Sequence, residues 1–370
     1  MGDAETAPGG RGGAGAPGAG SAATRLGNVA VVAALLAALA LFLAYADANF
    51  TGYRLQIVTL VAINAIVAVG LTVTSGFTGV FSLGQIGFYG IGAYVGALLT
   101  IAPRWKAERF LPGLPAWLAE FDTSGWHPQL ALLLACIAAG IVAAIVATVV
   151  GLPLMRLSGH YVAVATLGFL IIVNAVLVNW SEVTRGARGL NQIPGHTTPW
   201  VAYAWVIVTV YAALRLRYSP YGRAMIAQRE NLLAARGVGV AILPTRLLAF
   251  VVGAFFTGVA GALLAHQIGS VAPSLFSFTT TFTVVIMVVL GGLGSVSGAV
   301  VGAAIMTLAP EFLREVENGF ALGTIEVGAH PGLAQIILAV GFILVMIFRP
   351  QGLFGDRELL AGRFRKRGGT

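Results

Sequence analysis

The feature that most constrains this chain is a succession of long apolar segments separated by short polar loops. A helix needs about 20 mainly apolar residues to cross the hydrocarbon core of a membrane. We identify ten candidate spans: 29–46, 55–74, 81–101, 129–155, 161–180, 200–216, 246–266, 279–292, 294–309 and 333–348. The sequence therefore predicts an all-α, polytopic bundle of transmembrane helices, several of them broken by glycine.

Composition supports a membrane protein. Hydrophobic residues make up 58% of the chain and charged residues 10%, whereas a soluble domain carries about 25% charged residues. So few polar side chains cannot cover a water-facing surface, and we expect membrane lipid to cover most of it. The net charge of +8 lies in a few loops without interleaved aromatic residues, so we expect no nucleic-acid partner.

The two ends of the chain differ from its centre. Residues 1–24 are mostly Gly, Ala, Pro and Ser, which predicts a disordered cytoplasmic tail. Residues 25–355 form the predicted transmembrane domain, and residues 356–370 a basic cytoplasmic tail. The first span could instead be a signal peptide cleaved after Ala46; we favour a retained helix because the run is long for a signal peptide.

Loop charge predicts the orientation. With the N-terminus inside, the inner loops are 75–80, 156–160, 217–245 and 293, together with the C-terminal tail. The long inner loop has four arginines and one acid, whereas the outer loop 310–332 has four glutamates and one arginine. Basic loops on the cytoplasmic side are the expected pattern. Both termini are therefore predicted to be cytoplasmic.

Two glycine-rich turns join neighbouring spans on the predicted inner side. They are residues 75–85 and 290–298. Small residues permit close backbone approach and broken helices, and paired interruptions in two halves occur in many transporters. The turns either mark an internal repeat or are simple tight connections. The eighth and ninth spans are short, so they are either half-helices, a re-entrant pair or two full crossings.

No pattern typical of an enzyme is present. The sequence has no phosphate-binding loop, no H-E-x-x-H and no G-x-S-x-G. His160 and His266 lie at helix ends and are interpreted as interfacial residues, so no metal or cofactor is expected. The spans contain almost no Asp or Glu, which disfavours an ion-coupled transporter. A lipid-modifying enzyme has only His160 and Arg156 to support it.

Uncharged polar side chains lie within or beside the spans. Asn64, Gln85, Thr166 and Asn174 are the candidates for a translocation path. Such side chains also form ordinary hydrogen bonds between membrane helices, and both interpretations stay open. A neutral polar lining would let a small zwitterion pass without binding it tightly.

The long inner loop predicts a further helix. Ser219, Pro220 and Gly222 mark a break, and good helix formers over residues 223–236 lead to Gly237. Transporters driven by a separate ATPase need a rigid inner helix that docks on that ATPase. The alternative is an arginine-rich loop that only sets orientation.

Six segments, in order along residues 55–355, resemble one family. They are Ser82–Gln85 with Gly90–Tyr94, Gly159–Tyr161 with Ala165–Leu167, Ser219–Ala224, Leu248–Phe250 with Ala260–Ala262, Val289–Gly294 and Phe348–Leu353. Together they resemble the M-type permease subunits of bacterial ABC importers for branched-chain amino acids.

The resemblance implies a membrane permease of the bacterial inner membrane that imports branched-chain amino acids and is not itself an enzyme. It implies a homologous second permease, two ATP-binding cassette subunits and an extracytoplasmic solute-binding protein as partners. It also implies that loop 217–245 couples to the ATPase. The coupling residues would be Arg223, Glu230, Ala234, Ala235 and Gly237.

Three positions depart from the family pattern. Val80 replaces a usual glutamine, and Arg185 and Arg188 stand where Gly and Asn or Asp are usual. These changes leave the transporter prediction intact and the cargo open. Urea, amides or other amino acids are the alternatives, and a secondary transporter is the alternative mechanism.

Overall fold

The computed structural model describes residues 19–109, 114–123, 125–317, 320–322, 325–327, 332–355 and 358. It divides into two units, Met1–Phe50 and Thr51–Thr370. The described part of the first unit is helix α1 (Ala19–Asn49), followed by Phe50, whose ring makes edge contacts with Phe42 and Tyr45. Helix α1 contains the first predicted span and takes in residues 19–24 of the predicted tail; residues 1–18 and 359–370 lie outside the described residues.

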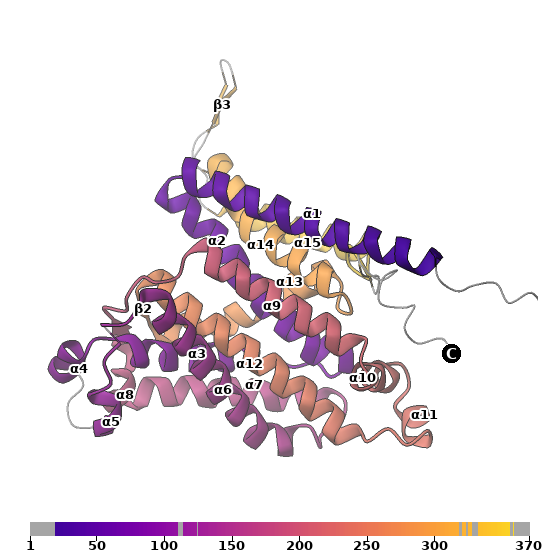
Figure 1. The fold of residues 1–370 in the computed structure, drawn as a ribbon, viewed down its shortest axis with the longest axis horizontal. Helices are drawn as coiled ribbons and strands as arrows, with labels where there is room; N and C mark the ends of the chain where they lie inside the picture. The colour runs from indigo at the N-terminus through magenta and orange to yellow at the C-terminus, as the bar shows by residue number, and fades with distance from the viewer. Residues whose placement is uncertain are drawn as a thin grey trace, which may run out of the picture. The chain divides into compact units, whose positions relative to one another are not determined.

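The second unit is a bundle of helices (Figure 1). Its main helices are α2 (Gly52–Leu71), α3 (Gln85–Thr100), α6 (Pro128–Leu154), α7 (His160–Asn179), α9 (Pro199–Arg217), α12 (Ile242–Ile268), α13 (Phe278–Gly291), α14 (Val296–Glu317) and α15 (Leu333–Phe348). A π-helical turn, η1 (Thr72–Gly76), continues α2. Each predicted span in this unit coincides with one of these helices, because long apolar runs form helices in lipid.

Shorter elements lie in the connections. They are helices α4 (Pro103–Arg109), α5 (Ala116–Ala119) and α8 (Ser181–Thr184), the 3-10 turns η2 (Gly186–Arg188) and η3 (Pro273–Phe276), and four strands. Strand β1 (Leu190–Asn191) pairs antiparallel with β2 (Ser270–Val271), and β3 (Phe320–Leu322) with β4 (Ile325–Val327). The fold is thus helical with little sheet, as predicted.

Helix length separates the candidate spans into two groups. Within the described residues, six helices are long and apolar enough to cross a membrane. Helix α13 has 14 residues, about 21 Å at 1.5 Å per residue, which is shorter than a hydrocarbon core of about 30 Å. Helix α14 extends to Glu317, beyond the predicted end at 309, and is long enough to cross. Ten crossings remain a prediction.

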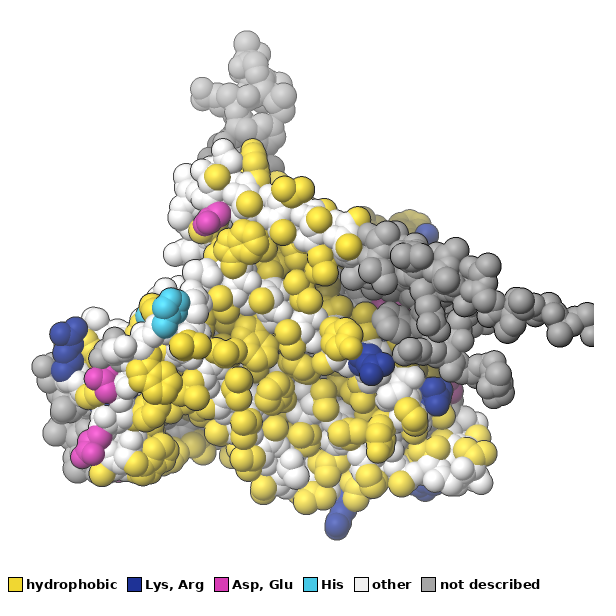
Figure 2. Space-filling view, in the orientation of Figure 1, with side chains coloured by type: hydrophobic (Ala, Val, Ile, Leu, Met, Phe, Trp, Pro, Cys, Tyr) yellow, Lys and Arg dark blue, Asp and Glu magenta, His cyan; other side chains and the backbone are white. Residues whose placement is uncertain are grey.

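Helix α6 has mostly small residues on its buried side and large apolar residues on its exposed side. On α6 the buried positions are mostly alanine or glycine, including Ala135, Ala139 and Ala143, while Ile141 and Ile145 are exposed. In Figure 2, hydrophobic side chains cover much of the visible face, and charged side chains gather toward two ends of the bundle. Helices that pack in lipid typically have small residues at their interfaces and apolar side chains on the surface that faces the lipid.

Helix α12 is the central helix of this unit and packs against α2, α3 and α6. Its glycines allow backbone contact with α3. An added Cβ at Gly92 would lie 2.1 Å from the Gly258 carbonyl oxygen, and one at Gly261 would lie 2.1 Å from the Tyr89 carbonyl oxygen. Only glycine permits so close an approach.

Loops that were predicted to share the inner side meet at one end of the bundle. Arg229 Nη1 donates to the Gly76 carbonyl at 3.0 Å, Arg217 Nη1 donates to the Gly294 carbonyl, and Arg246 Nη1 donates to the Leu157 carbonyl at 3.3 Å. We name this the basic end: residues 76–84, 155–159, 217–245, 292–295, 349–355 and 358. The grouping agrees with the charge pattern, although the side of the membrane stays a prediction.

The remaining described loops make their contacts at the opposite end. There β1 pairs with β2, and Asn174 Nδ2 on α7 donates to the Pro273 and Phe276 carbonyls at 3.1 and 3.3 Å. The Tyr53 hydroxyl at the start of α2 donates to Glu311 of α14 at 2.7 Å. The bundle therefore has two chemically distinct ends.

Candidate functional site

The predicted coupling helix is two helices. Residues 220–237 form α10 (Pro220–Glu230) and α11 (Leu232–Gly237), so the single helix expected over 223–236 is wrong. Asn231 between them has extended backbone angles (φ −153°, ψ 108°). Its Oδ1 accepts from the backbone N–H groups of Leu233 and Ala234, both at 3.0 Å. An asparagine side chain that caps a new helix competes with continuation of the old one.

Helix α10 is tied to the end of α9. Ser219 Oγ accepts from the Gly222 N–H at 3.1 Å, and Pro220 occupies the first turn, which is a favourable helix start. A Cβ at Gly222 would lie 2.0 Å from the Leu216 carbonyl oxygen. Burial raises the pKa of the phenol of Tyr218, one of the two residues between α9 and α10.

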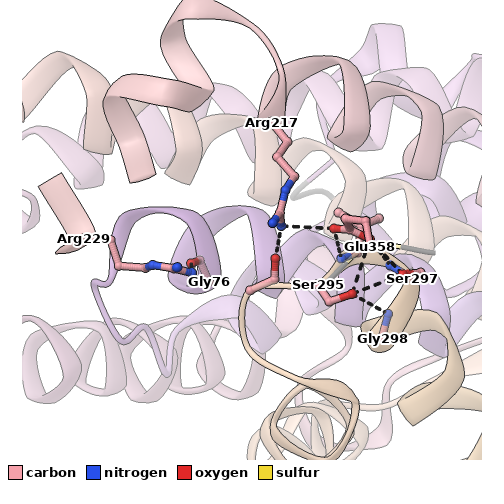
Figure 3. A network of polar contacts seen from close by, with 9 residues as sticks. Gly76, Arg217, Arg229, Ser295, Ser297, Gly298 and Glu358 are labelled. Atoms are coloured by element: carbon pink, nitrogen blue, oxygen red, sulfur yellow. Dashed lines mark hydrogen bonds and ion pairs between the residues drawn. The ribbon is translucent and has the colours of Figure 1, made fainter. Parts of the chain in front are cut away.

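One face of this segment is packed into the bundle. Met225, Gln228 and Ala235 are buried. Arg229 donates to the Gly76 carbonyl of η1, which Figure 3 shows beside it, and its Nη2 also lies 2.8 Å from exposed Glu230. The segment is therefore held to the bundle by packing and by Arg229.

The other face is exposed and apolar. Leu233 is 77% exposed and Val238 80% exposed, and Ala234 and Gly237 are exposed beside them. An added Cβ at Gly237 would meet nothing within 4 Å. Arg223 is also exposed and donates to the Tyr218 carbonyl at 3.3 Å. Of the predicted coupling residues, Ala235 is thus buried and Arg223, Glu230, Ala234 and Gly237 face outward.

The four predicted path residues do not form one cluster. Asn64 on α2 donates to Thr307 of α14 at 2.9 Å, and Asn174 holds the η3 turn at the opposite end. Thr166 on α7 accepts from the Leu83 N–H at 3.0 Å, two residues before Gln85. The structure therefore brings Thr166 near the start of α3 and leaves Asn64 and Asn174 elsewhere.

Gln85 differs from the other three. Its side chain is 1% exposed, and its Nε2 donates to Thr257 of α12 at 2.6 Å. Its Oε1 is buried without a hydrogen-bond partner among the described residues. A buried acceptor that lacks a partner is costly, and this oxygen distinguishes Gln85 from the other three residues.

Sequence reasoning missed the groups that fix residues 219–240, named here the coupling segment after the predicted role. Asn231 carried a signal, because asparagine before small helix formers is a typical N-cap. Arg217 and Arg229 were interpreted only as positive charges that set the orientation of the chain in the membrane. Glu358 gave no signal, because its partners lie at least 61 positions away. Within the described residues, no group of three His, Cys, Asp or Glu side chains could hold a metal ion.

Comparison with known proteins agrees with the geometry. Residues 53–346 match the family described as branched-chain amino acid transport system, permease component. The high-affinity branched-chain amino acid transport system permease protein LivM of Escherichia coli K12 is 32% identical over 332 residues, covering 80% of this chain and 69% of that protein.

Two further relatives extend the comparison. The permease protein LivH of the same E. coli system is 28% identical over 338 residues, covering 86% of this chain and 98% of that protein. The probable LivM of Methanocaldococcus jannaschii is 23% identical over 251 residues, covering 64% and 72%. The chain therefore belongs to the family of permease components of branched-chain amino acid transport systems.

Proposed function

We propose that this chain is a permease subunit of an ATP-driven importer that moves branched-chain amino acids inward across a bacterial inner membrane. Its partners are a homologous permease subunit, two ATP-binding subunits and an extracytoplasmic solute-binding protein. ATP hydrolysis belongs to the partner subunits. One observation carries the proposal. In a chain of this family, α11 exposes apolar side chains, and the segment that contains α11 is anchored at the basic end of the bundle.

The coupling role follows from the two faces of residues 219–240. The inner face is fixed by Met225, Gln228 and the contact of Arg229 with Gly76. The outer face presents Leu233 and Val238 without cover among the described residues. Exposed large apolar side chains on a rigid, cytoplasmic element favour contact with another protein. A partner that pushes α11 would move α10 and, through it, η1.

Asn64, Gln85, Thr166 and Asn174 remain our candidates for the translocation path. Gln85 has the strongest support, because its buried Oε1 is available to a donor. The other three already join helices or loops. An uncharged acceptor would bind the ammonium group of an amino acid weakly enough to release it.

The test of the function is uptake of labelled leucine into vesicles that contain this chain with its candidate partners. Uptake should require both ATP and the ATP-binding subunits. Uptake of urea or another amino acid under the same requirement would replace the cargo and keep the mechanism. Uptake that persists without the ATP-binding subunits would refute the importer.

The coupling role has a separate test in Gly237→Leu. An added Cβ there meets nothing within 4 Å, so we expect the chain itself to fold normally and the effect to arise in a contact with a partner. We expect lower uptake and weaker retention of the ATP-binding subunits during purification. Gly125→Leu is the matched control, because Gly125 is equally open and lies in the connection before α6. Normal uptake by Gly237→Leu would remove this face from the docking surface.

A further inference from the structure

The C-terminal segment of the chain is bound into the basic end by one buried carboxylate. The side chain of Glu358 is 1% exposed. Its Oε1 lies 3.0 Å from Arg217 Nη1 and accepts from the Val296 N–H at 2.7 Å. Its Oε2 accepts from the Ser297 N–H at 3.1 Å and from the Ser297 and Ser295 hydroxyls at 2.8 and 3.3 Å. Figure 3 shows these side chains converging on the carboxylate.

This carboxylate binds the first two N–H groups of α14 and supplements its N-cap residue Ser295, whose Oγ accepts from the Gly298 N–H at 3.0 Å. The first N–H groups of a helix have no partner within the helix, and a negative charge near them is favoured by the helix dipole. Here the capping group comes from 62 residues further along the chain. Residues shortly before Glu358 also bind this end of the bundle. The Leu353 and Phe354 N–H groups donate to the Leu290 and Gly291 carbonyls at 2.9 and 3.1 Å.

Arg217 links the same carboxylate to the coupling segment. It is the last residue of α9 and stands two positions before Ser219, the N-cap of α10. Its guanidinium donates to the Gly294 carbonyl and lies 5.6 Å from the centre of the Phe77 ring. One arginine thus touches both glycine-rich turns and the start of the coupling segment.

The coupling segment is therefore attached at two points. Arg229 binds Gly76 at the end of α10, and Arg217 binds Gly294 just before α10 begins. The two turns also touch one another, because a Cβ at Gly76 would overlap the Leu293 carbonyl. Among the described residues, a buried carboxylate, Glu358, faces Arg217, and the exposed carboxylate of Glu230 faces Arg229.

We propose that Arg217, Glu358, Ser295 and Ser297 form a C-terminal clamp that transmits movement of the coupling segment to α13 and α14. Glu358 is then a positioning residue, which fixes Arg217 against the 292–295 turn. This inference rests on the proposed function, and it makes the C-terminal segment part of the transport machinery.

The test uses the assembled importer, purified through a tag on the N-terminus of this chain and reconstituted into vesicles. Leucine uptake and ATP hydrolysis are measured on the same sample. Glu358→Gln preserves the shape of the side chain and removes the charge opposite Arg217. We expect leucine moved per ATP hydrolysed to fall by roughly tenfold, since losing one partner of a buried charged contact changes an equilibrium by about that factor. Hydrolysis itself should continue.

Three further variants complete the design: Glu311→Gln, Arg217→Met alone, and the double variant Arg217→Met/Glu358→Gln. Glu311→Gln is the matched control, because it removes the carboxylate of a more exposed pair with Arg314, 3.4 Å apart, and the ratio should stay at the wild-type value. Arg217→Met/Glu358→Gln leaves no unpaired buried charge and should fold even if the single variant does not. Its ratio should be no lower than that of either single variant, because both changes break one contact.

The outcomes are distinct. A wild-type ratio in Glu358→Gln, effects that add in the double variant, or proportional loss of uptake and hydrolysis would each overturn the clamp. Wild-type uptake that does not need ATP would instead overturn the proposed function.

Discussion

Gly92→Ala is expected to force α3 away from α12. The added Cβ would lie 2.1 Å from the Gly258 carbonyl oxygen and 2.5 Å from the Gly258 Cα. Even close C–H···O contacts need about 3.3 Å, so the helices would have to separate by about 1 Å. The opposing atoms belong to the backbone, so no rotamer change can relieve the contact.

The magnitude follows from two opposing effects. Overpacking a tight interface costs about 1–3 kcal/mol, and the upper end applies to a clash with backbone. Replacing glycine by alanine inside a helix stabilises the helix by about 1 kcal/mol. We therefore expect Gly92→Ala to lower the free energy of unfolding by about 2 kcal/mol.

Gly168→Ala is the matched control on α7. A Cβ there meets nothing within 4 Å, so only the favourable propensity of about 1 kcal/mol remains. Thermal unfolding of the two purified variants in the same detergent measures the difference. At about 2 °C for each kcal/mol in a chain of this size, the melting temperatures should differ by roughly 6 °C. Equal melting temperatures would refute backbone contact between α3 and α12.

Two further predictions concern the coupling segment and the path. Asn231→Ala removes the cap of α11, which costs about 1 kcal/mol, and should speed proteolysis of residues 219–241 and reduce uptake. Asn231→Asp keeps an acceptor and should show wild-type proteolysis and wild-type uptake. Equal proteolysis of all three proteins would show that the cap is dispensable. Gln85→Leu removes the free acceptor and should raise the KM for leucine about tenfold, as expected for a lost hydrogen bond to a charged group, whereas an unchanged KM would confine Gln85 to helix packing.

Hydropathy located the helices well because each long apolar run must form its hydrogen bonds internally in lipid. Local signals also located the start of α10, where Ser219, Pro220 and Gly222 act through neighbours in the chain. The interruption at Asn231 was missed because the helix formers on both sides outweighed one capping residue. The length of α14 was underestimated because its last turns are polar and leave the apolar pattern.

The contacts that hold the basic end together could not be read from the sequence. Arg217 and Arg229 belong to the same charge-rich loop as Arg236, and nothing local shows that the first two bind glycine-rich turns while Arg236 is exposed. Glu358 lies in a tail dominated by positive charge. These are long-range pairings, and their partners become neighbours only after the helices have packed.

The glycine contacts between α3 and α12 also restrict how the permease can change its access. Where Gly92 meets Gly258 and Gly96 meets Ala262, there are few side-chain atoms that could repack into a second arrangement. A tightly fitted interface of this kind favours one geometry over continuous deformation. The two helices should therefore move together as one rigid body. The change between inward-open and outward-open states should occur at helix interfaces lined by longer side chains.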